Sequence, residues 1–166
     1  TDFHTWIERH FATSVLFEDD IFDFEDDIQS DPEMAESQEL SPLERLKSDW
    51  FASEWSARHP IAVEEGFEIV IEGILFRGRI DAVYRIDDTH YEVVDWKTGK
   101  VKSGEDLSNA AIQLAMYRLA FSKLHNIPLE QISAAFHYIP SNTTIRPADI
   151  LSESEITTII TSIELE

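Results

Sequence analysis

Hydrophobic residues near the start of the chain recur at helical spacing. Phe3, Ile7 and Phe11 would lie on one side of a short helix. Farther along, Ser41-Pro42-Leu43-Glu44 places a capping serine, a proline at the first helical position and a glutamate three residues after the cap. These and similar signals predict helices over residues 2–12, 41–58 and 108–124 and from residue 152 onward.

The middle of the chain has a different pattern. It is rich in β-branched and aromatic residues, with breaks at Gly73, Gly78 and Asp87-Asp88. We therefore expect three antiparallel strands, followed after the long helix by two more. The predicted strands cover residues 66–72, 75–86, 90–97, 132–139 and 144–146. This order predicts an α/β fold in which helices flank a mixed β-sheet.

The turn at Asp87-Asp88 suggests how the second and third strands pair. If residue 86 faces residue 90, partners sum to 176, and Asp81 faces Asp95. Cβ atoms of such partners are about 5 Å apart. Alternation places Lys97 on the same face as Asp95. The pattern therefore predicts two carboxylates and one ammonium at the end of a hairpin.

Two carboxylates at that separation repel each other unless a cation lies between them, and hard oxygen ligands favour Mg²⁺ or Mn²⁺. The alternative is a surface ion pair between Asp95 and Lys97, with Asp81 unrelated. The apolar neighbours Val93 and Val94 favour a functional site, because charged residues within such strands need a reason.

Composition changes this picture in two ways. The formal net charge of -20 argues by itself against DNA binding. Residues 18–39, however, hold 11 acids and no Lys or Arg, whereas residues 77–118 hold seven bases and seven acids. We interpret the acidic stretch, about 18–40, as an insertion.

With no cysteine in the chain, disulfides, thiolate zinc sites and cysteine-held iron–sulfur clusters are excluded.

Four short motifs together resemble a known family. Gly78-Arg79-Ile80-Asp81 and Asp95-Trp96-Lys97-Thr98 are similar to the P-D-(D/E)-x-K nuclease signature, with isoleucine in place of its proline. Gln113-Leu114-Ala115-Met116-Tyr117 resembles the Q-x-x-x-Y motif of the RecB-like branch. The stretch from Thr1 to Glu8, which includes His4, resembles the upstream histidine motif of actinobacterial UvrD/Rep-type helicase–nucleases.

The resemblance implies a restriction-endonuclease-like fold and a metal-dependent deoxyribonuclease that uses Mg²⁺ or Mn²⁺. His4, Asp81, Asp95 and the main-chain carbonyl of Trp96 would bind the metal. Lys97 would orient the attacking water and stabilise the negative charge that develops on phosphorus.

Gln113 and Tyr117 would lie on one face of the long helix and contact the site or the DNA. Tyr117 has an alternative role in the apolar core of that helix. Lys100 and Lys102 follow the third strand; they form either a solvated loop or contacts to DNA phosphates.

Residues 1–166 are expected to form one domain of a longer helicase–nuclease in recombination or repair. Its partners would be DNA, an attached helicase motor and a second helicase–nuclease subunit. No apolar run is long enough to cross a bilayer, and we expect a cytoplasmic protein without a membrane partner. The alternatives are a stand-alone resolvase or repair nuclease, an idle DNA- or partner-binding domain, and an acidic interaction module.

Overall fold

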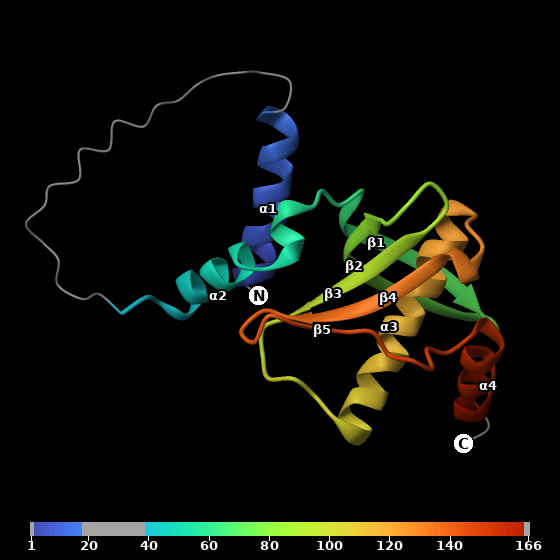
Figure 1. Cartoon of the computed structure of the whole chain (residues 1–166). Coiled ribbons are helices and arrows are strands. Elements are labelled where there is room, and N and C mark those ends of the chain that lie inside the picture. The colour runs from blue at the N-terminus through green and yellow to red at the C-terminus, as the bar shows by residue number, and fades with distance from the viewer. Residues whose placement is uncertain (1, 18–38, 165–166) are drawn as a thin grey trace, which may run out of the picture.

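A central β-sheet carries helices on both of its faces (Figure 1). The computed structural model describes residues 2–17 and 39–164. The acidic insertion expected at about 18–40 therefore lies almost entirely outside the described residues. In chain order, the elements are α1 (Asp2–Phe17), α2 (Pro42–Phe51), the 3₁₀ helix η1 (Glu54–Ala57), β1 (Ala62–Ile71), β2 (Ile74–Arg85), β3 (Tyr91–Lys97), α3 (Gly104–His125), the 3₁₀ helix η2 (Leu129–Gln131), β4 (Ile132–Tyr138), β5 (Thr143–Ile145) and α4 (Glu153–Glu164).

The five strands form one mixed sheet in the order β1-β2-β3-β4-β5. Neighbours are antiparallel except for β3 and β4, which run parallel because α3 connects them in a crossover. The expected α/β class with a mixed sheet flanked by helices is confirmed. Figure 1 shows the end of β3 directed toward the N-terminal part of α1.

The hydrophobic core has two halves, one on each face of the sheet. On one face, α3 and α4 contribute buried residues such as Leu119, Phe121 and Ile156. On the other face, α1 and α2 contribute residues such as Ile7 and Trp50. Both faces of β3 and β4 are therefore covered over most of their length.

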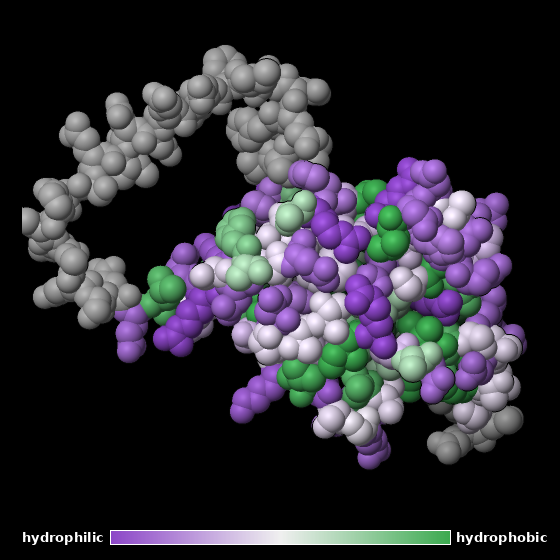
Figure 2. Space-filling model, viewed as in Figure 1, coloured by the Kyte–Doolittle hydropathy of each residue, from purple (hydrophilic) through white to green (hydrophobic). Residues whose placement is uncertain are grey.

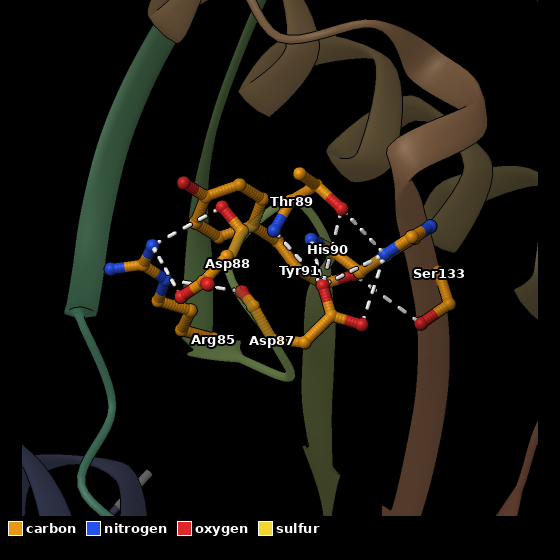
Figure 3. Close-up of polar contacts among 7 residues, drawn as sticks. All are labelled: Arg85, Asp87, Asp88, Thr89, His90, Tyr91 and Ser133. Carbon is orange, nitrogen blue, oxygen red and sulfur yellow. Dashed lines mark hydrogen bonds and ion pairs between the residues drawn. The ribbon is translucent and has the colours of Figure 1, made fainter.

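The turn between β2 and β3 fixes the register of the hairpin (Figure 3). The carboxylate of Asp87 accepts hydrogen bonds from the main-chain N–H groups of Thr89 and His90, each at 2.9 Å. The N–H of Ile86 donates to the carbonyl of His90 at 2.9 Å. Partners such as Ala82 and Val94 therefore sum to 176, which confirms the predicted register.

One backbone feature distorts the sheet beside this hairpin. The β1–β2 register places Glu64 opposite Asp81. Glu64 has a φ of 49°, in the left-handed region that residues other than glycine rarely adopt. Ile80 and Val83 pack in the same half of the core, although residues three apart on a regular strand face opposite sides. The regular alternation of β2 side chains between the two faces of the sheet is therefore interrupted next to Asp81.

Several predicted boundaries were wrong, for local reasons. β1 begins at Ala62 rather than at residue 66, because the polar run Glu64-Glu65-Gly66 hides its start. The second helix ends at Phe51, and the chain continues as η1 rather than as a helix to residue 58. α1 continues to Phe17 and α3 begins at Gly104, so both helices are longer than expected.

The face of the molecule in Figure 2 is mostly hydrophilic, with separate patches of hydrophobic side chains. Val70 and Leu75, which pair across β1 and β2 near their turn, are exposed apolar residues. Within the described residues, no helix is both long enough and apolar enough to span a bilayer.

The turn makes a prediction about stability. Asp87→Ala removes the acceptor of the Thr89 and His90 N–H groups, so we expect a lower melting temperature. Asp87→Asn keeps an acceptor oxygen and should lose less. Asp88→Ala, at the neighbouring exposed carboxylate, is the matched control. Thermal unfolding of the three variants measures this, and equal melting temperatures for Asp87→Ala and Asp88→Ala would contradict it.

Candidate active site

A cavity of about 310 Å³ lies at the end of β3. It brings together six of the seven residues that the sequence singled out, from two helices and two strands. The exception is Tyr117, which does not line the cavity. The lining consists of His4, Asp81, Asp95, Trp96, Lys97, Thr98, Gly99, Lys100, Lys102, Gln113 and Tyr138.

His4 reaches the sheet from α1 and meets two groups there. Its Nε2 lies 3.2 Å from the main-chain carbonyl oxygen of Trp96 and 3.4 Å from Oδ2 of Asp81. The same Asp81 oxygen accepts a 2.8 Å hydrogen bond from the N–H of Trp96. The peptide groups on either side of the Trp96 α-carbon therefore hold both the carboxylate and the imidazole in place.

Asp95 and Lys97 form the other half of the cluster. They lie two residues apart on β3, and the Lys97 Nζ is 2.8 Å from Oδ2 of Asp95. Continuing the hairpin register by one residue places Asp95 opposite Asp81. Asp81 therefore lies opposite Asp95, as the sequence predicted. Asp95 also forms the ion pair with Lys97 that the alternative interpretation expected.

The surroundings of the two carboxylates shift their pKa values in opposite directions. Burial, reinforced by the neighbouring Asp81, raises the pKa of Asp95 to about 7, although Lys97 opposes the shift. Burial also disfavours ionisation of Asp81, but hydrogen bonds from His4 and other neighbours outweigh it, and its pKa is lowered. The hydrogen bond with Asp81 raises the pKa of His4 against the opposing effect of burial. A cation in the cavity would relieve this repulsion.

The donor atoms suit an octahedral divalent cation. Mg²⁺ binds oxygen at about 2.1 Å, so adjacent ligands of its octahedron are about 3 Å apart. The separations from the His4 Nε2 to the Trp96 carbonyl and to the Asp81 carboxylate, 3.2 and 3.4 Å, are close to that value. Among the described residues, however, no three histidine or acidic side chains already form a complete metal cage. Metal binding would therefore require these side chains to move.

Gln113 and Tyr117 lie on α3, across the cavity from His4. The Gln113 amide donates a 2.8 Å hydrogen bond to the Tyr117 hydroxyl. Gln113 lines the cavity, whereas the Tyr117 ring packs against Phe67 in the core, at 5.7 Å between ring centroids. Burial, followed by Asp95 and Asp81, raises the pKa of Tyr117 to about 12. Tyr117 thus packs in the core, as the alternative interpretation expected. The charges of Asp95 and Asp81 also act on its hydroxyl.

Sequence reasoning missed two residues at the site. The first is Glu64, whose Oε1 is buried without a hydrogen-bond partner among the described residues. Burial, then the charge of Asp81, raises its pKa. The second is Tyr138, at the end of β4, which lines the cavity. The parallel pairing of Tyr138 with Lys97 could not be read from the sequence. Glu64 lies in the polar start of β1, which the sequence did not mark as part of a strand.

The family model of the PD-(D/E)XK nuclease superfamily matches residues 1–161. No curated protein matches the chain. Among solved structures, SSO0001 has a TM-score of 0.45 and 22% identity, with 74% of this chain and 57% of SSO0001 covered. A candidate exonuclease from Eubacterium rectale has a TM-score of 0.48 and 12% identity, with 99% of this chain and 63% of the other covered. The chain therefore spans about three fifths of the length of either structure.

The raised pKa of Asp95 predicts a pH-dependent stability in the absence of metal. The folded chain binds this proton more readily than the unfolded chain does, so Asp95 destabilises the fold as pH rises from its ordinary pKa of 3.8 to about 7. Asp95→Asn should therefore gain melting temperature relative to wild type across that range, by roughly 2–4 °C for each kcal/mol of repulsion removed.

Melting temperatures in EDTA between about pH 5 and pH 8 measure the effect. Asp88→Asn makes the same chemical change at an exposed carboxylate and should follow wild type. Parallel pH curves for wild type and Asp95→Asn would mean that the fold does not hold Asp95 in a repulsive environment.

Proposed function

Because the chain belongs to the PD-(D/E)XK nuclease superfamily, we propose that it is a metal-dependent deoxyribonuclease that hydrolyses phosphodiester bonds with Mg²⁺ or Mn²⁺. The observation that carries this proposal is the convergence of His4, Asp81, Asp95 and Lys97 in one cavity. A domain that only holds DNA has no need for two buried carboxylates that repel each other beside a lysine.

In the proposed reaction, His4, the two aspartates and the Trp96 carbonyl would hold the divalent cation. When bound, the cation polarises a phosphate oxygen and lowers the pKa of a water molecule. Lys97 lies beside Asp95 and orients the attacking water. A bond forms between the water oxygen and phosphorus while the bond to the leaving sugar oxygen breaks. The attacking water gives up a proton to solvent, and the leaving sugar oxygen takes one up from solvent to become a hydroxyl. Lys97 also stabilises the charge that develops on the phosphate oxygens.

Gln113 has an accessory role in this proposal. Its side chain lines the cavity, and its amide is oriented by the Tyr117 hydroxyl. The amide is therefore available to a phosphate oxygen or to the attacking water. Tyr117 acts through Gln113 as a positioning residue.

The RecB-like assignment and the attached helicase belong to the same proposal. The histidine of α1 at the cavity and the Gln113–Tyr117 pair support the assignment, because these features distinguish that branch in the sequence. A net charge of -20 makes unaided DNA binding weak, and an attached motor would supply effective concentration instead. A stand-alone nuclease of the same fold is the second candidate.

We expect Asp81→Ala, Asp95→Ala and Lys97→Ala each to abolish cleavage of single- and double-stranded DNA in Mg²⁺ or Mn²⁺, while the fold remains intact. The two aspartates would hold the cation and Lys97 would act beside the reacting phosphate, and none of the three lies in the centre of the core. Nuclease assays and melting temperatures of the same preparations test this. Activity within a few-fold of wild type in any one of them would reject the assignment of the site.

Metal binding can be measured without activity. Mn²⁺ should raise the melting temperature of the wild type but not of Asp95→Ala, because binding to the folded state alone stabilises it. Glu64→Gln removes a nearby negative charge and should weaken Mn²⁺ binding several-fold in calorimetry. Glu68→Gln makes the same change at an exposed position of β1 and should bind as wild type does. Equal affinities for the two glutamine variants would exclude a role for Glu64.

The dependence on a motor also has a direct test. The isolated domain should bind DNA more weakly than about 1 μM near physiological salt, with Ca²⁺ replacing Mg²⁺ to limit cleavage. A salt titration of binding gives both the affinity and the number of phosphate contacts. Sub-micromolar affinity under these conditions would favour the stand-alone nuclease.

A further inference from the structure

The loop that joins β3 to α3 forms one wall of the cavity. Its residues Thr98, Gly99, Lys100 and Lys102 all line the cavity beside Lys97. Both lysine side chains are exposed, and residues 98–103 contain no acid. We call Lys100 and Lys102 the lysine rim. Only Val101 separates the two lysines, so no acid interrupts their positive charge beside the cavity.

The lysine rim differs from other lysines of the chain in having no carboxylate partner. Lys47 lies 3.0 Å from Glu44, and Lys123 lies 2.8 Å from Glu153. Among the described residues, no carboxylate lies within ion-pair distance of Lys100 or Lys102. Their charges are therefore compensated only by solvent, and an anion in the cavity would meet no competing internal partner.

The backbone holds the rim at the cavity. The N–H of Lys102 donates a 3.4 Å hydrogen bond to the Tyr138 hydroxyl, whose ring is buried. Directly afterwards the chain turns into α3 through Gly104, which has a φ of 57°. The rim is thus fixed between the end of β4 and the start of α3. A loop attached at this point keeps its lysines close to Asp95 and Lys97.

We infer that Lys100 and Lys102 bind the phosphates of the substrate strand next to the one that is cleaved. This inference rests on the proposed function, and it replaces the solvated loop that the sequence left open. Lysine is a point charge that suits phosphate oxygens without reading bases. The rim therefore supplies sequence-independent affinity and orients the strand along the β3–α3 loop.

The order of the strands gives this contact a direction. Glu64 of β1 lies close enough to Asp81 and to Glu8 of α1 for their charges to act on it, whereas the rim lies beside the ends of β3 and β4. Arg79, also near Glu64, partly offsets the acids on the β1 side. The strand consequently makes its stronger backbone contacts on the β3–β4 side of the cleaved bond.

The test uses the double variant Lys100→Ala/Lys102→Ala and a fluorescein-labelled single-stranded oligothymidylate. Binding is measured by anisotropy in Ca²⁺ between about 50 and 200 mM salt, where each phosphate contact to a single strand contributes about 0.7 to the log–log slope. We expect the slope to fall by about 1.4. In Mg²⁺, the KM should rise while kcat stays unchanged. Lys47→Ala/Lys123→Ala makes the same net charge change away from the cavity and is the matched control.

A second substrate separates phosphate contact from a general charge effect. An oligothymidylate with neutral methylphosphonate linkages should bind the wild type and the rim variant equally, which completes a protein–substrate cycle. An unchanged salt slope and KM in the rim variant, or an equal loss in the control, would overturn the inference while leaving the nuclease in place. If the wild type binds single strands through the rim but does not cleave them, the proposed nuclease function is wrong. The inference that the rim contacts phosphates would still stand.

Discussion

The peptide groups of Trp96 are the point on which the cavity depends. The N–H holds the Asp81 carboxylate, and the carbonyl faces the imidazole of His4. The ring of the same residue is 1% exposed and packs edge-on against Trp50 of α2, with 4.7 Å between ring centroids. Truncating a buried aromatic side chain typically costs 3–5 kcal/mol. The packing that stabilises this half of the core therefore also positions polar groups of the site.

The cluster of His4, Asp81, Asp95 and Lys97 contains an unfavourable electrostatic interaction. Two carboxylates face each other in a buried hairpin. Hydrogen bonds favour the ionised form of Asp81, whereas burial and Asp81 raise the pKa of Asp95 more than Lys97 lowers it. The left-handed backbone of Glu64, directly opposite Asp81, adds conformational strain at the same place. Strain and repulsion are maintained because the surrounding sheet is paired and covered on both faces. Fold stability elsewhere thus sustains a site that is unfavourable by itself.

Much of the cavity followed from local spacing. The turn at Asp87 predicted a register that brought Asp81 and Asp95 together, since a hairpin register depends only on residues near the turn. Glu64 and Tyr138 were missed because their contacts are not local. The polar start of β1 resembles a loop, and the parallel pairing of β4 with β3 is established by packing across the sheet. Sequence patterns describe elements better than the contacts between distant ones.

The number of residues between two contacting groups bears on the order in which the groups of the site come together. Asp81 and Trp96 are 15 residues apart and meet within one hairpin, whereas His4 and Trp96 are 92 residues apart. Closing the longer loop costs more conformational entropy, so contacts of this kind form late in folding. We therefore expect the aspartates to come together before the imidazole reaches them, and the cavity to be completed when α1 docks. We expect partly folded chains to hold the hairpin before the cluster of His4, Asp81, Asp95 and Lys97 is complete.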